Sequence, residues 1–367
     1  MPRNILIAAN SFKGTLSSQR VAHIIAQSWE TIHPHDKVRA IPLSDGGESF
    51  ARSLSAHIKS TKHSTQIRQT SDKKYRVYWY KCINKNIALV DVASLLGLNK
   101  YSNISPFERD SFALGEFLIK ISRHPLKQIV IGLGGSGTND GGFGLARALG
   151  WRFLNKRGQE IRQWFKLNHL HKINSPAVRT KLPPLLAAAD VRNPLIGPDG
   201  CTKIFGPQKG LTKSEIIHAE KALKRLAHVV ERNSEHDIKD LAHAGAAGGL
   251  GFGLRAFCRA ELSSGFDYFA QKINLSKHVM NADLIICAEG TLDPTSFMGK
   301  STGEVARHAK KGGTPCIALC GQHKKSRDNY SFFKIVGALE EITSRENAFQ
   351  HTTFWLKKLA QKVAKQL

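Results

Sequence analysis

Long apolar runs are missing from this 367-residue sequence. A helix that spans a bilayer needs about 20 consecutive apolar residues, and no segment approaches that length. The apolar stretch near the start, residues 5–9, is too short for the core of a signal peptide and leads directly into a segment typical of a folded domain. We therefore expect a soluble, cytoplasmic protein without a membrane partner.

Cysteines with the spacing of a metal site are also missing. The six cysteines include no Cys-x-x-Cys motif, and the sixteen histidines are dispersed along the chain. Three of the cysteines, Cys287, Cys316 and Cys320, lie in apolar segments typical of strands. We expect buried, reduced thiols and histidines in surface loops rather than a zinc site.

Acidic residues are few: 29 Asp and Glu stand against 54 Lys and Arg, which gives a net charge of +25 at pH 7. Such an excess is common in proteins that bind nucleic acids. Here, however, the basic residues are spread along the whole chain, and we find no basic tail, no RGG tract and no interleaving of basic and aromatic residues. We therefore favour a solvated basic surface that attracts anionic substrates, and we do not expect a nucleic-acid partner.

Internal repeats and low-complexity linkers are absent, so domain boundaries are weakly marked, although the length suggests two domains. Apolar segments without alternation predict buried strands at residues 5–9, 38–43, 128–133, 185–189, 284–287 and 316–320, and residues 66–92 are rich in β-formers. Helical periodicity predicts helices around Val21–Trp29 and at residues 112–121, 145–149, 214–231, 303–310 and 353–365, the last on the surface. This alternation predicts an α/β fold with parallel sheets.

Glycine and polar residues collect directly after five of the apolar segments. These polar segments are 11–14, 45–48, 134–142, 190–195 and 289–293, and Lys300 follows shortly after the last. Each one alone is consistent with ordinary turn chemistry. In parallel α/β sheets, however, ligands bind beyond the carboxyl ends of the strands. Carboxylates, lysines and a glycine-rich turn in that place suit phosphoryl transfer, which needs metal-binding carboxylates, cations and a group that positions the attacking hydroxyl.

Two standard nucleotide-binding signatures are nearly matched in the chain, one of them at the start of the glycine-rich segment 134–142. Residues 299–301, Gly-Lys-Ser, resemble the end of a P-loop, but Pro294 stands where that motif needs glycine. Residues 132–137 have the G-x-G-x-x-G spacing, but Thr-Asn-Asp follows where the helix of a dinucleotide-binding fold begins. Neither signature therefore identifies the ligand.

The same segment nevertheless predicts an anion-binding nest, because successive backbone N–H groups in a glycine-rich turn before a helix point at one place. Hydroxyl, amide and carboxylate groups beside the glycines suit phosphate oxygens and a hydrated Mg²⁺ ion. Tight turns alone would explain the glycines but not this polar set. The predicted nucleotide-binding residues are Gly134, Gly135, Ser136, Thr138, Asn139 and Asp140.

Taken in order, these motifs resemble the bacterial glycerate kinase family of the type that includes the glycerate 2-kinases. Nine matching segments keep the family order from the first strand to about Gly321: 11–14, 42–48, 132–142, 190–195, 205–210, 245–251, 282–285, 289–293 and 299–300. The second of them reads Pro-Leu-Ser-Asp-Gly-Gly-Glu and ends at Glu48. The resemblance covers most of the chain.

The resemblance implies two α/β domains. The first is a Rossmann-like three-layer domain from both chain ends, residues 1–62 and 283–367, and the second is an inserted α/β domain, residues 63–282, that carries the glycine-rich motif. The implied activity is ATP-dependent phosphorylation of glycerate or a close hydroxy acid, with Mg²⁺, usually to 2-phosphoglycerate. The sequence leaves the oligomeric state open, and a homodimer is one alternative.

Residue roles follow from matching the motifs. We expect the nest and Lys209 to hold ATP phosphates, and Asp45 together with Asp293 or Glu289 to hold Mg²⁺. Asp190 would position or deprotonate the hydroxyl of the substrate. The predicted catalytic residues are Asp190, Asp45, Lys13 and Lys300, the two lysines neutralising the substrate carboxylate or the γ-phosphate, and the predicted substrate-binding residues are Ser11 and Asn193.

Several sites depart from the family pattern. Asn10 stands where aspartate is usual, Ser49-Phe50 replaces Gly-Thr, and Ala113-Leu114 replaces the first half of a Gly-Thr-Gly-Glu stretch. Ala288 replaces a glycine, and Thr291 replaces an arginine that is a plausible bidentate partner for a carboxylate. The alternative is therefore a catalytically weakened member that binds a ligand or a partner. Charge-driven nucleic-acid binding is a third alternative, which strongly salt-dependent DNA binding would reveal.

Overall fold

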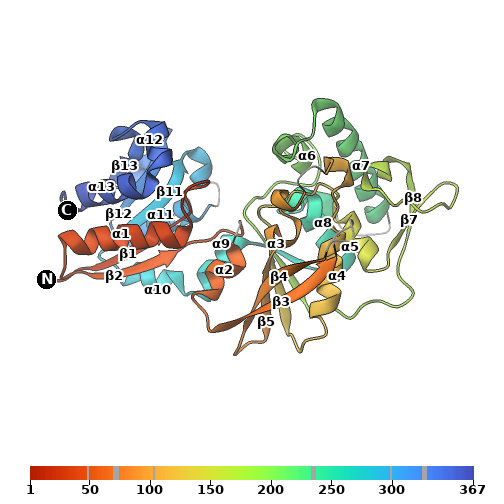
Figure 1. Cartoon of the computed structure of the whole chain (residues 1–367), viewed down its shortest axis with the longest axis horizontal. Helices are drawn as coiled ribbons and strands as arrows, with labels where there is room; N and C mark the ends of the chain where they lie inside the picture. Colours follow the sequence, from red (N-terminus) through yellow and green to blue (C-terminus); the bar gives the residue numbers. More distant parts are fainter. Residues whose placement is uncertain (48, 69–73, 102–103, 233–236, 298–299, 325–328) are drawn as a thin grey trace. The chain divides into compact units, whose positions relative to one another are not determined.

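The computed structural model describes residues 1–47, 49–68, 74–101, 104–232, 237–297, 300–324 and 329–367 (Figure 1). Contacts within the chain divide it into two units. Unit 1 consists of Met1–Asp45 and Phe269–Leu367, and unit 2 consists of Gly46–Tyr268. The chain passes between the units after Asp45 and after Tyr268. The predicted domain boundaries, after residues 62 and 282, each lie further along the chain than the corresponding passage and stay a prediction.

Unit 1 is built on a parallel sheet with the strand order β13-β12-β11-β1-β2. Its strands are β1 (Asn4–Ala9), β2 (Lys37–Pro42), β11 (Leu284–Leu292), β12 (Cys316–His323) and β13 (Ile335–Ala338). In the centre, β1 pairs with β11 and places Ile7 opposite Ile286. The first strand is apolar without alternation because both of its faces are buried.

The helices of unit 1 lie between and after these strands along the chain. They are α1 (Ser18–Ile32), α10 (Leu275–Met280), α11 (Ser301–Lys311), α12 (Arg345–Gln350) and α13 (Thr352–Ala364). α1 and α13 contact each other, and Ile7, Trp29 and Leu356 belong to one buried cluster. The predicted apolar face of α1 is buried as expected. α13 is more than a surface helix, since its side with Leu356 and Leu359 is buried.

Unit 2 contains a mixed sheet with the strand order β10-β9-β6-β5-β4-β3. Its strands are β3 (Ser60–Arg68), β4 (Lys74–Cys82), β5 (Ile87–Asp91), β6 (Gln128–Gly132), β9 (Leu185–Ala189) and β10 (Glu261–Ser264), and a separate hairpin consists of β7 (Arg152–Asn155) and β8 (Leu170–Asn174). In this sheet, β5 pairs with β6, β6 with β9, and β9 with β10 in parallel, whereas β3 pairs with β4 and β4 with β5 in antiparallel fashion. The carboxyl ends of β6 and β9 therefore lie side by side at one edge.

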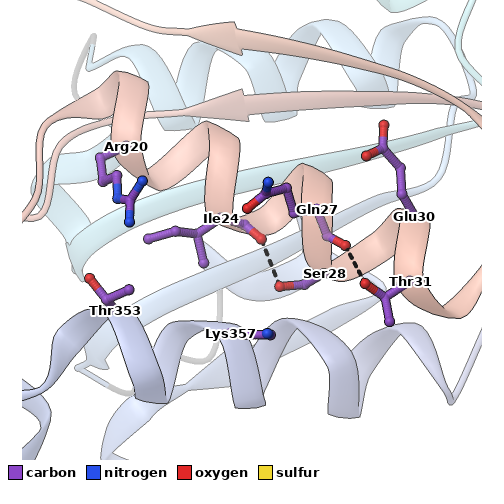
Figure 2. A pocket seen from close by; sticks show the side chains of 8 residues that line it. All are labelled: Arg20, Ile24, Gln27, Ser28, Glu30, Thr31, Thr353 and Lys357. Carbon is purple, nitrogen blue, oxygen red and sulfur yellow. Dashed lines mark hydrogen bonds between the residues drawn. The ribbon is translucent and has the colours of Figure 1, made fainter.

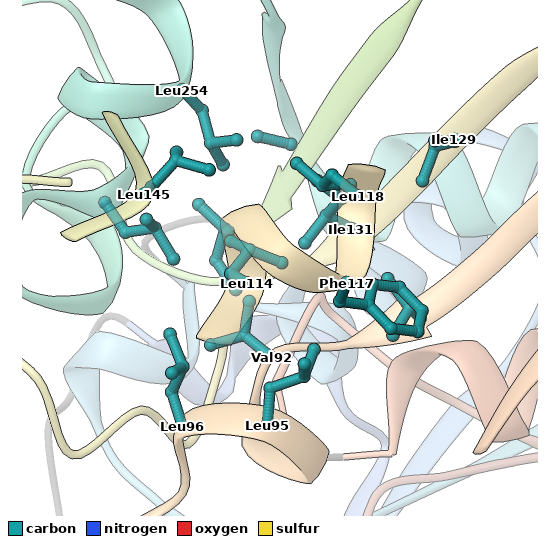
Figure 3. Close-up of a cluster of buried hydrophobic side chains, with 14 of the residues drawn as sticks. Val92, Leu95, Leu96, Leu114, Phe117, Leu118, Ile129, Ile131, Leu145 and Leu254 are labelled. Atoms are coloured by element: carbon teal, nitrogen blue, oxygen red, sulfur yellow. The ribbon is translucent and has the colours of Figure 1, made fainter. Parts of the chain in front are cut away.

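The helices of unit 2 pack in two apolar clusters. They are α2 (Phe50–Ser55), α3 (Ala93–Leu96), α4 (Phe112–Ile121), α5 (Phe143–Ala148), α6 (Cys201–Phe205), α7 (Lys213–Glu231) and α8 (Ala246–Cys258), and α9 (Gly265–Lys272) spans the boundary to unit 1 in sequence. Figure 3 shows how Leu114 and Phe117 of α4 meet Ile131 of β6, Leu145 of α5 and Leu254 of α8 in one of these clusters.

The predicted α/β fold class is confirmed. Every predicted strand and helix has its counterpart, and the β-rich residues 66–92 contain the end of β3 and all of β4 and β5. Helix α8 was not predicted, because its first residues, Ala247 to Gly249, have left-handed rather than helical backbone and interrupt the apolar periodicity. Within the described ranges, we find no helix long and apolar enough to cross a membrane.

Candidate active site

The glycine-rich loop between β6 and α5 is held in place by backbone hydrogen bonds to three other segments of unit 2. The N–H of Gly134 donates to the carbonyl of Gly46 at 2.9 Å, that of Gly137 to Leu96 at 2.6 Å, and that of Gly141 to Gly248 at 3.1 Å. Within this loop Gly135 is exposed and has a φ of +76°, a conformation that glycine adopts without strain. The loop is therefore rigid at its base and accessible at Gly135.

Asp140 is the internal anchor of the loop. Its Oδ2 accepts hydrogen bonds from the N–H of Ser111 (2.8 Å), the hydroxyl of Ser111 (2.7 Å) and the N–H of Gly144 (2.9 Å), and its Oδ1 accepts one from Gly142 (3.2 Å). Burial raises the pKa of Asp140, and these donors oppose the shift. Burial also raises the pKa of the neighbouring Asp110 to about 6, and the charge of Asp140 adds to the effect. The oxygens of Asp140 are engaged in holding the loop.

Two oxygens beside Asp140 lack a protein partner. Oγ1 of Thr138 and Oδ1 of Asn139 have no hydrogen-bond partner among the described residues, although these residues are 0% and 2% exposed. The amide nitrogen of Asn139 donates to Oγ1 of Thr202 at 2.9 Å, which fixes the orientation of its side chain. Buried polar atoms without a partner are costly in a folded protein. A bound ligand would satisfy both.

Lys209 brings a buried cation to the same loop. It is 4% exposed, and its Nζ donates to the carbonyl of Thr138 at 2.7 Å and contacts Oγ of Ser136 at 3.4 Å. In the part of the chain that the structure describes, Lys209 forms no ion pair with a carboxylate. Burial lowers its pKa to about 8. A buried ammonium group without a carboxylate partner is suited to binding an anion.

The start of α8 lies directly against the glycine-rich loop and Lys209. Gly248 has a φ of +69°, and a Cβ atom at this position would lie 2.0 Å from the carbonyl oxygen of Thr138 and 2.9 Å from Nζ of Lys209. No side chain fits between α8 and the loop. The glycine-rich segment 245–251 therefore supports the nest by close backbone approach.

Asp190 follows β9, the strand next to β6. It is half-buried, and the parallel register of Gly132 with Ala188 brings the segment after β9 to the same sheet edge as the glycine-rich loop. The predicted substrate role of Asn193 stays a prediction, and the structure shows two bonds within its own loop region. Its amide nitrogen donates to the carbonyl of Asp199 at 2.8 Å, and its own carbonyl accepts the N–H of Gly245 at 2.9 Å. Asn193 thus ties its loop to the start of α8.

In unit 1 the carboxyl ends of β1 and β11 carry the second group of predicted residues. Glu289 on β11 is 8% exposed, and burial raises its pKa to about 7. Lys300 opposes this shift and Asp45 adds to it, so both lie close enough to act on the carboxyl group. The hydroxyls of Ser296 and Thr302 also oppose the shift, so both lie close to the carboxyl group. Among the described residues, Oε2 of Glu289 has no hydrogen-bond partner of good geometry.

Asn10 positions the first turn of α11 beside this carboxyl group. Its amide nitrogen donates to Oγ of Ser301 at 3.1 Å, and its Oδ1 accepts the N–H of Ser11 at 2.9 Å. Ser301 is the first residue of α11 and follows Lys300. An aspartate at this position would accept a hydrogen bond from the hydroxyl of Ser301 instead of donating one, so the contact itself does not require asparagine.

Thr291 is paired with a neutral side chain. Nε2 of Gln322 donates to Oγ1 of Thr291 at 3.0 Å, and the two residues are opposite one another in the parallel pair of β11 and β12. Two residues further, the N–H of Asp293 donates to Oγ of Ser296 at 3.2 Å, which closes the turn after β11. The strand end thus presents a hydroxyl and an amide where the family pattern has arginine.

A surface groove of unit 1 lies apart from these strand ends. It is formed by α1 and α13 and is lined by Arg20, Ile24, Gln27, Ser28, Glu30, Thr31, Thr353 and Lys357 (Figure 2). The hydroxyls of Ser28 and Thr31 donate to carbonyls of their own helix, at 2.6 Å and 2.7 Å. None of the predicted site residues lines this groove, and the hydroxyls of Ser28 and Thr31 are already bonded.

The comparison with known proteins gives the family. Residues 5–367 match the model of the glycerate kinase family. The chain belongs to the glycerate kinase family. The glycerate 2-kinase of Escherichia coli (strain K12) is 32% identical over 351 residues, which are 92% of each protein. The glycerate kinase of Halalkalibacterium halodurans is 31% identical over 368 residues, 98% of this chain and 97% of the relative.

A solved structure agrees with this assignment. A crystal structure from Salmonella typhimurium LT2 that carries the name glycerate kinase 2 superposes with a TM-score of 0.79 at 30% sequence identity, and it covers 100% of this chain and 98% of that chain. The recognition of the glycerate kinase family from the ordered motifs is therefore confirmed, and so is the expectation that the chain is an enzyme of this family.

In this family member the predicted site residues fall into two sets. Unit 1 contains Ser11, Lys13, Asp45, Glu289, Asp293 and Lys300, and unit 2 contains Gly134, Gly135, Ser136, Thr138, Asn139, Asp140, Asp190, Asn193 and Lys209. Glu48 and Gly299, which belong to the matched motifs, lie outside the described residues. Lys13 is exposed, and Ser11 is half-buried.

Four hydroxyl residues that contact the predicted site residues, or lie beside them, are absent from the sequence prediction: Thr202, Ser296, Ser301 and Thr302. Ser301 and Thr302 directly follow the matched Gly-Lys motif, so a helix start at that point could have indicated them. Thr202 has no such signal, because its partner Asn139 lies 63 residues earlier in the sequence.

The carboxylates of unit 1 are compatible with magnesium but do not form a closed cage. Among the described residues, no group of three or more His, Cys, Asp or Glu side chains is arranged to hold a metal ion. Mg²⁺ is usually bound by one or two carboxylates together with substrate phosphates and waters. The partnerless Oε2 of Glu289, near Asp45, fits such an incomplete protein ligand set.

Proposed function

We propose that the chain transfers the γ-phosphoryl group of ATP to glycerate, with Mg²⁺, and that the product is 2-phosphoglycerate. The observation that carries this proposal is Lys209, a buried cation that has no carboxylate partner among the described residues. It lies beside the oxygens of Thr138 and Asn139, for which the described residues offer no partner either. A polyphosphate supplies the negative charge and the acceptors that such a site needs. The names of the relatives in the family support glycerate as the acceptor.

The nest and Lys209 would hold the phosphates of the nucleotide. Gly134 and Gly135 allow the chain to approach the phosphate oxygens closely, and Ser136, Thr138 and Asn139 provide polar side chains. Asp140 keeps its predicted place in the site, but it acts by holding the loop, since its oxygens accept bonds from the loop and from Ser111. This division gives the loop a rigid base and a polar surface for the ligand.

The carboxylates of unit 1 would hold the metal ion. Asp45, with Asp293 or Glu289, offers hard oxygen ligands of the kind that Mg²⁺ prefers. When bound, Mg²⁺ neutralises phosphate charge during phosphoryl transfer. Lys13 and Lys300 would neutralise the carboxylate of the substrate or the γ-phosphate, and Ser11 and the first turn of α11 at Thr302 would add donors.

Asp190 would position the attacking hydroxyl of glycerate or accept its proton. It follows the strand next to the glycine-rich loop, so it lies beside the group that we assign to the phosphates. Asn193, by contrast, would support this place indirectly through its bonds to Asp199 and Gly245. A cytoplasmic location and a homodimer also stay predictions.

A second candidate is a weakened kinase that retains ligand binding. The neutral pair of Thr291 and Gln322 favours it, because neither side chain can form an ion pair with the carboxylate of glycerate. An ATP-consumption assay with D-glycerate, L-glycerate and related hydroxy acids tests both candidates. Turnover of glycerate above all other acids supports the kinase. Nucleotide binding without turnover of any acid would leave the weakened member as the better account.

A further inference from the structure

The hairpin of β3 and β4 presents cations and aromatic rings on one face. The register pairs residues of β3 with residues of β4 so that eight side chains share this face: Lys62, Ser64, Gln66, Arg68, Lys74, Arg76, Tyr78 and Tyr80. We call it the outer face. The opposite face is the buried one, where Ile67, Val77 and Trp79 are each 1% exposed and belong to the core of unit 2. All residues of the outer face except the half-buried Tyr80 are exposed.

The outer face has no negative charge of its own. Neither β3 nor β4 contains an aspartate or a glutamate, whereas the face carries two lysines and two arginines. Nζ of Lys62 lies 4.1 Å from the centre of the Tyr78 ring, and Tyr78 is 48% exposed. A cation against an exposed ring combines a charge for a phosphate with a flat surface for stacking.

Two acidic groups near the hairpin are engaged elsewhere, and Asp72, which lies between β3 and β4 in sequence, is outside the described residues. Glu116 of α4 accepts the N–H of Arg68 at 2.7 Å and forms an ion pair with Lys120 at 2.9 Å. Asp91, which faces Tyr80 at the inner end of the hairpin, accepts the N–H of Ala51 at 2.8 Å. Lys120 also donates to the carbonyl of Gln66 at 2.8 Å. These bonds occupy part of the free edge of β3, so a second strand cannot pair there.

We propose that the outer face of β3 and β4 binds single-stranded nucleic acid. Alternate residues of a strand are about 7 Å apart, so Lys74 and Arg76 on β4 match the spacing of successive phosphates of an extended strand in order of magnitude, and Arg68 lies opposite Lys74. Tyr78 and Tyr80 offer rings on which bases stack, and such a combination of basic groove and aromatic rings is typical of sequence-tolerant single-strand binding. A second copy of the chain is disfavoured as the occupant, because the same positive charges would face one another.

One of the grounds for expecting no nucleic-acid partner is the absence of basic–aromatic interleaving. Residues 74–81, Lys-Tyr-Arg-Val-Tyr-Trp-Tyr-Lys, do interleave the two kinds of residue. The strand period of two assigns Lys74, Arg76, Tyr78 and Tyr80 to the exposed face and sends Val77 and Trp79 into the core. The strand register therefore identifies a surface of basic and aromatic residues that the composition of the whole chain does not indicate.

The test is binding of a fluorescein-labelled oligothymidine of about 15 nucleotides to the full chain, followed by fluorescence anisotropy over roughly 50 to 300 mM salt. Removing two cations with Lys62→Gln and Arg76→Gln should reduce the slope of log K against log salt by about 1.4, at about 0.7 for each phosphate contact. Tyr78→Ala should weaken binding at least about fivefold, and Tyr78→Phe should retain it, because phenylalanine keeps the stacking surface.

The matched control removes the same charge from another exposed surface. Lys221 and Lys224 lie exposed on α7, and the double change Lys221→Gln and Lys224→Gln should leave the salt slope nearly unchanged. Thermal unfolding checks that every variant is folded. Equal loss in this control would overturn the proposal, because binding would then follow net charge alone. Binding to vesicles of phosphatidylserine and phosphatidylcholine without binding to the oligonucleotide, or an unchanged affinity of Tyr78→Ala, would overturn it as well.

Discussion

At the scale of single residues, both predicted sets contain buried polar groups that the described residues do not fully satisfy. These groups are Lys209, Thr138 and Asn139 in unit 2 and Glu289 in unit 1. Desolvation of such groups costs free energy in the unliganded protein. A ligand with phosphate and carboxylate groups would recover that cost.

Lys209 should make nucleotide binding depend on pH. Its pKa in the folded protein is about 8, below its ordinary value, because burial disfavours the charged form. The ammonium group that binds phosphate is therefore present below pH 8 and is lost as the pH rises through that value. We expect the affinity for ATP, measured by calorimetry, to fall above about pH 8, whereas Lys209→Met should bind ATP about ten- to a hundredfold more weakly and without this decline.

The stability of the same variant separates the two possible roles of Lys209. A buried lysine with a lowered pKa destabilises the folded state below that pKa, and the penalty disappears as the pH rises from the folded to the unfolded value. Lys209→Met should thus be at least as stable as the wild type at pH 7 in thermal unfolding. An unfolded variant, or one with unchanged ATP affinity, would argue that Lys209 is structural.

Asp190 should be needed for turnover but not for folding. Asp190→Asn keeps the shape of the side chain and removes its charge, so we expect a loss of two or more orders of magnitude in kcat with little change in the melting temperature. The matched control is Asp199→Asn in the same loop, since the backbone carbonyl of Asp199, not its side chain, holds Asn193. Near-normal kcat in Asp190→Asn would exclude Asp190 from the chemistry.

Thr291→Arg tests whether the neutral pair with Gln322 weakens substrate binding. An arginine would lose the bond to Gln322 but could bond the carboxylate of glycerate, a charge-assisted interaction of about 1.5–3 kcal/mol. We expect the KM for glycerate to fall by about ten- to a hundredfold and the KM for ATP to stay nearly unchanged. An unchanged KM for glycerate in a folded variant would show that Thr291 does not limit carboxylate binding.

At the scale of elements, the site is assembled where glycine-rich segments approach one another without side chains. The first turn of α8 touches the glycine-rich loop at Gly248, and the loop touches Lys209 in turn. A change in one element is therefore transmitted to the predicted phosphate site through backbone contact.

Gly248→Ala should disturb both stability and ATP binding. Left-handed backbone costs a non-glycine residue about 1–2 kcal/mol, and forcing a methyl group against the carbonyl of Thr138 adds about 1–3 kcal/mol. The control is Gly158→Ala, because Gly158 also has a positive φ, of +73°, but has nothing within 4 Å of the added Cβ. We expect urea unfolding to show the backbone cost alone for Gly158→Ala, with ATP affinity unchanged. Equal effects of both changes on ATP affinity would contradict the contact.

Sequence patterns predicted these elements unevenly. The helix 112–121 and the strand 185–189 were predicted with the bounds that the structure has, since their apolar periodicity is uninterrupted. The loop 134–142 was predicted as a nest because glycines and polar residues are adjacent in sequence. The approach of Gly248 to the loop and the bond between Asn139 and Thr202 join distant segments, so local patterns could not indicate them.

At the scale of the whole molecule, the positive charge is compatible with two uses. A net charge of +25 attracts anions such as glycerate and ATP, and it also favours polyanions at the outer face of β3 and β4. The two predicted sets of site residues lie in different units of the chain, each at the carboxyl ends of parallel strands. The family places this arrangement among glycerate kinases.

Phosphorus NMR of the purified chain with ATP, Mg²⁺ and D-glycerate tests the central proposal most directly. The proposal predicts that the γ-phosphate signal of ATP disappears, that ADP accumulates, and that the new phosphomonoester signal is that of 2-phosphoglycerate. Omission of glycerate should stop the change, and Lys209→Met should slow it at subsaturating ATP. Persistence of the γ-phosphate signal with every form of glycerate, from a folded protein that binds ATP, would contradict the proposed kinase activity.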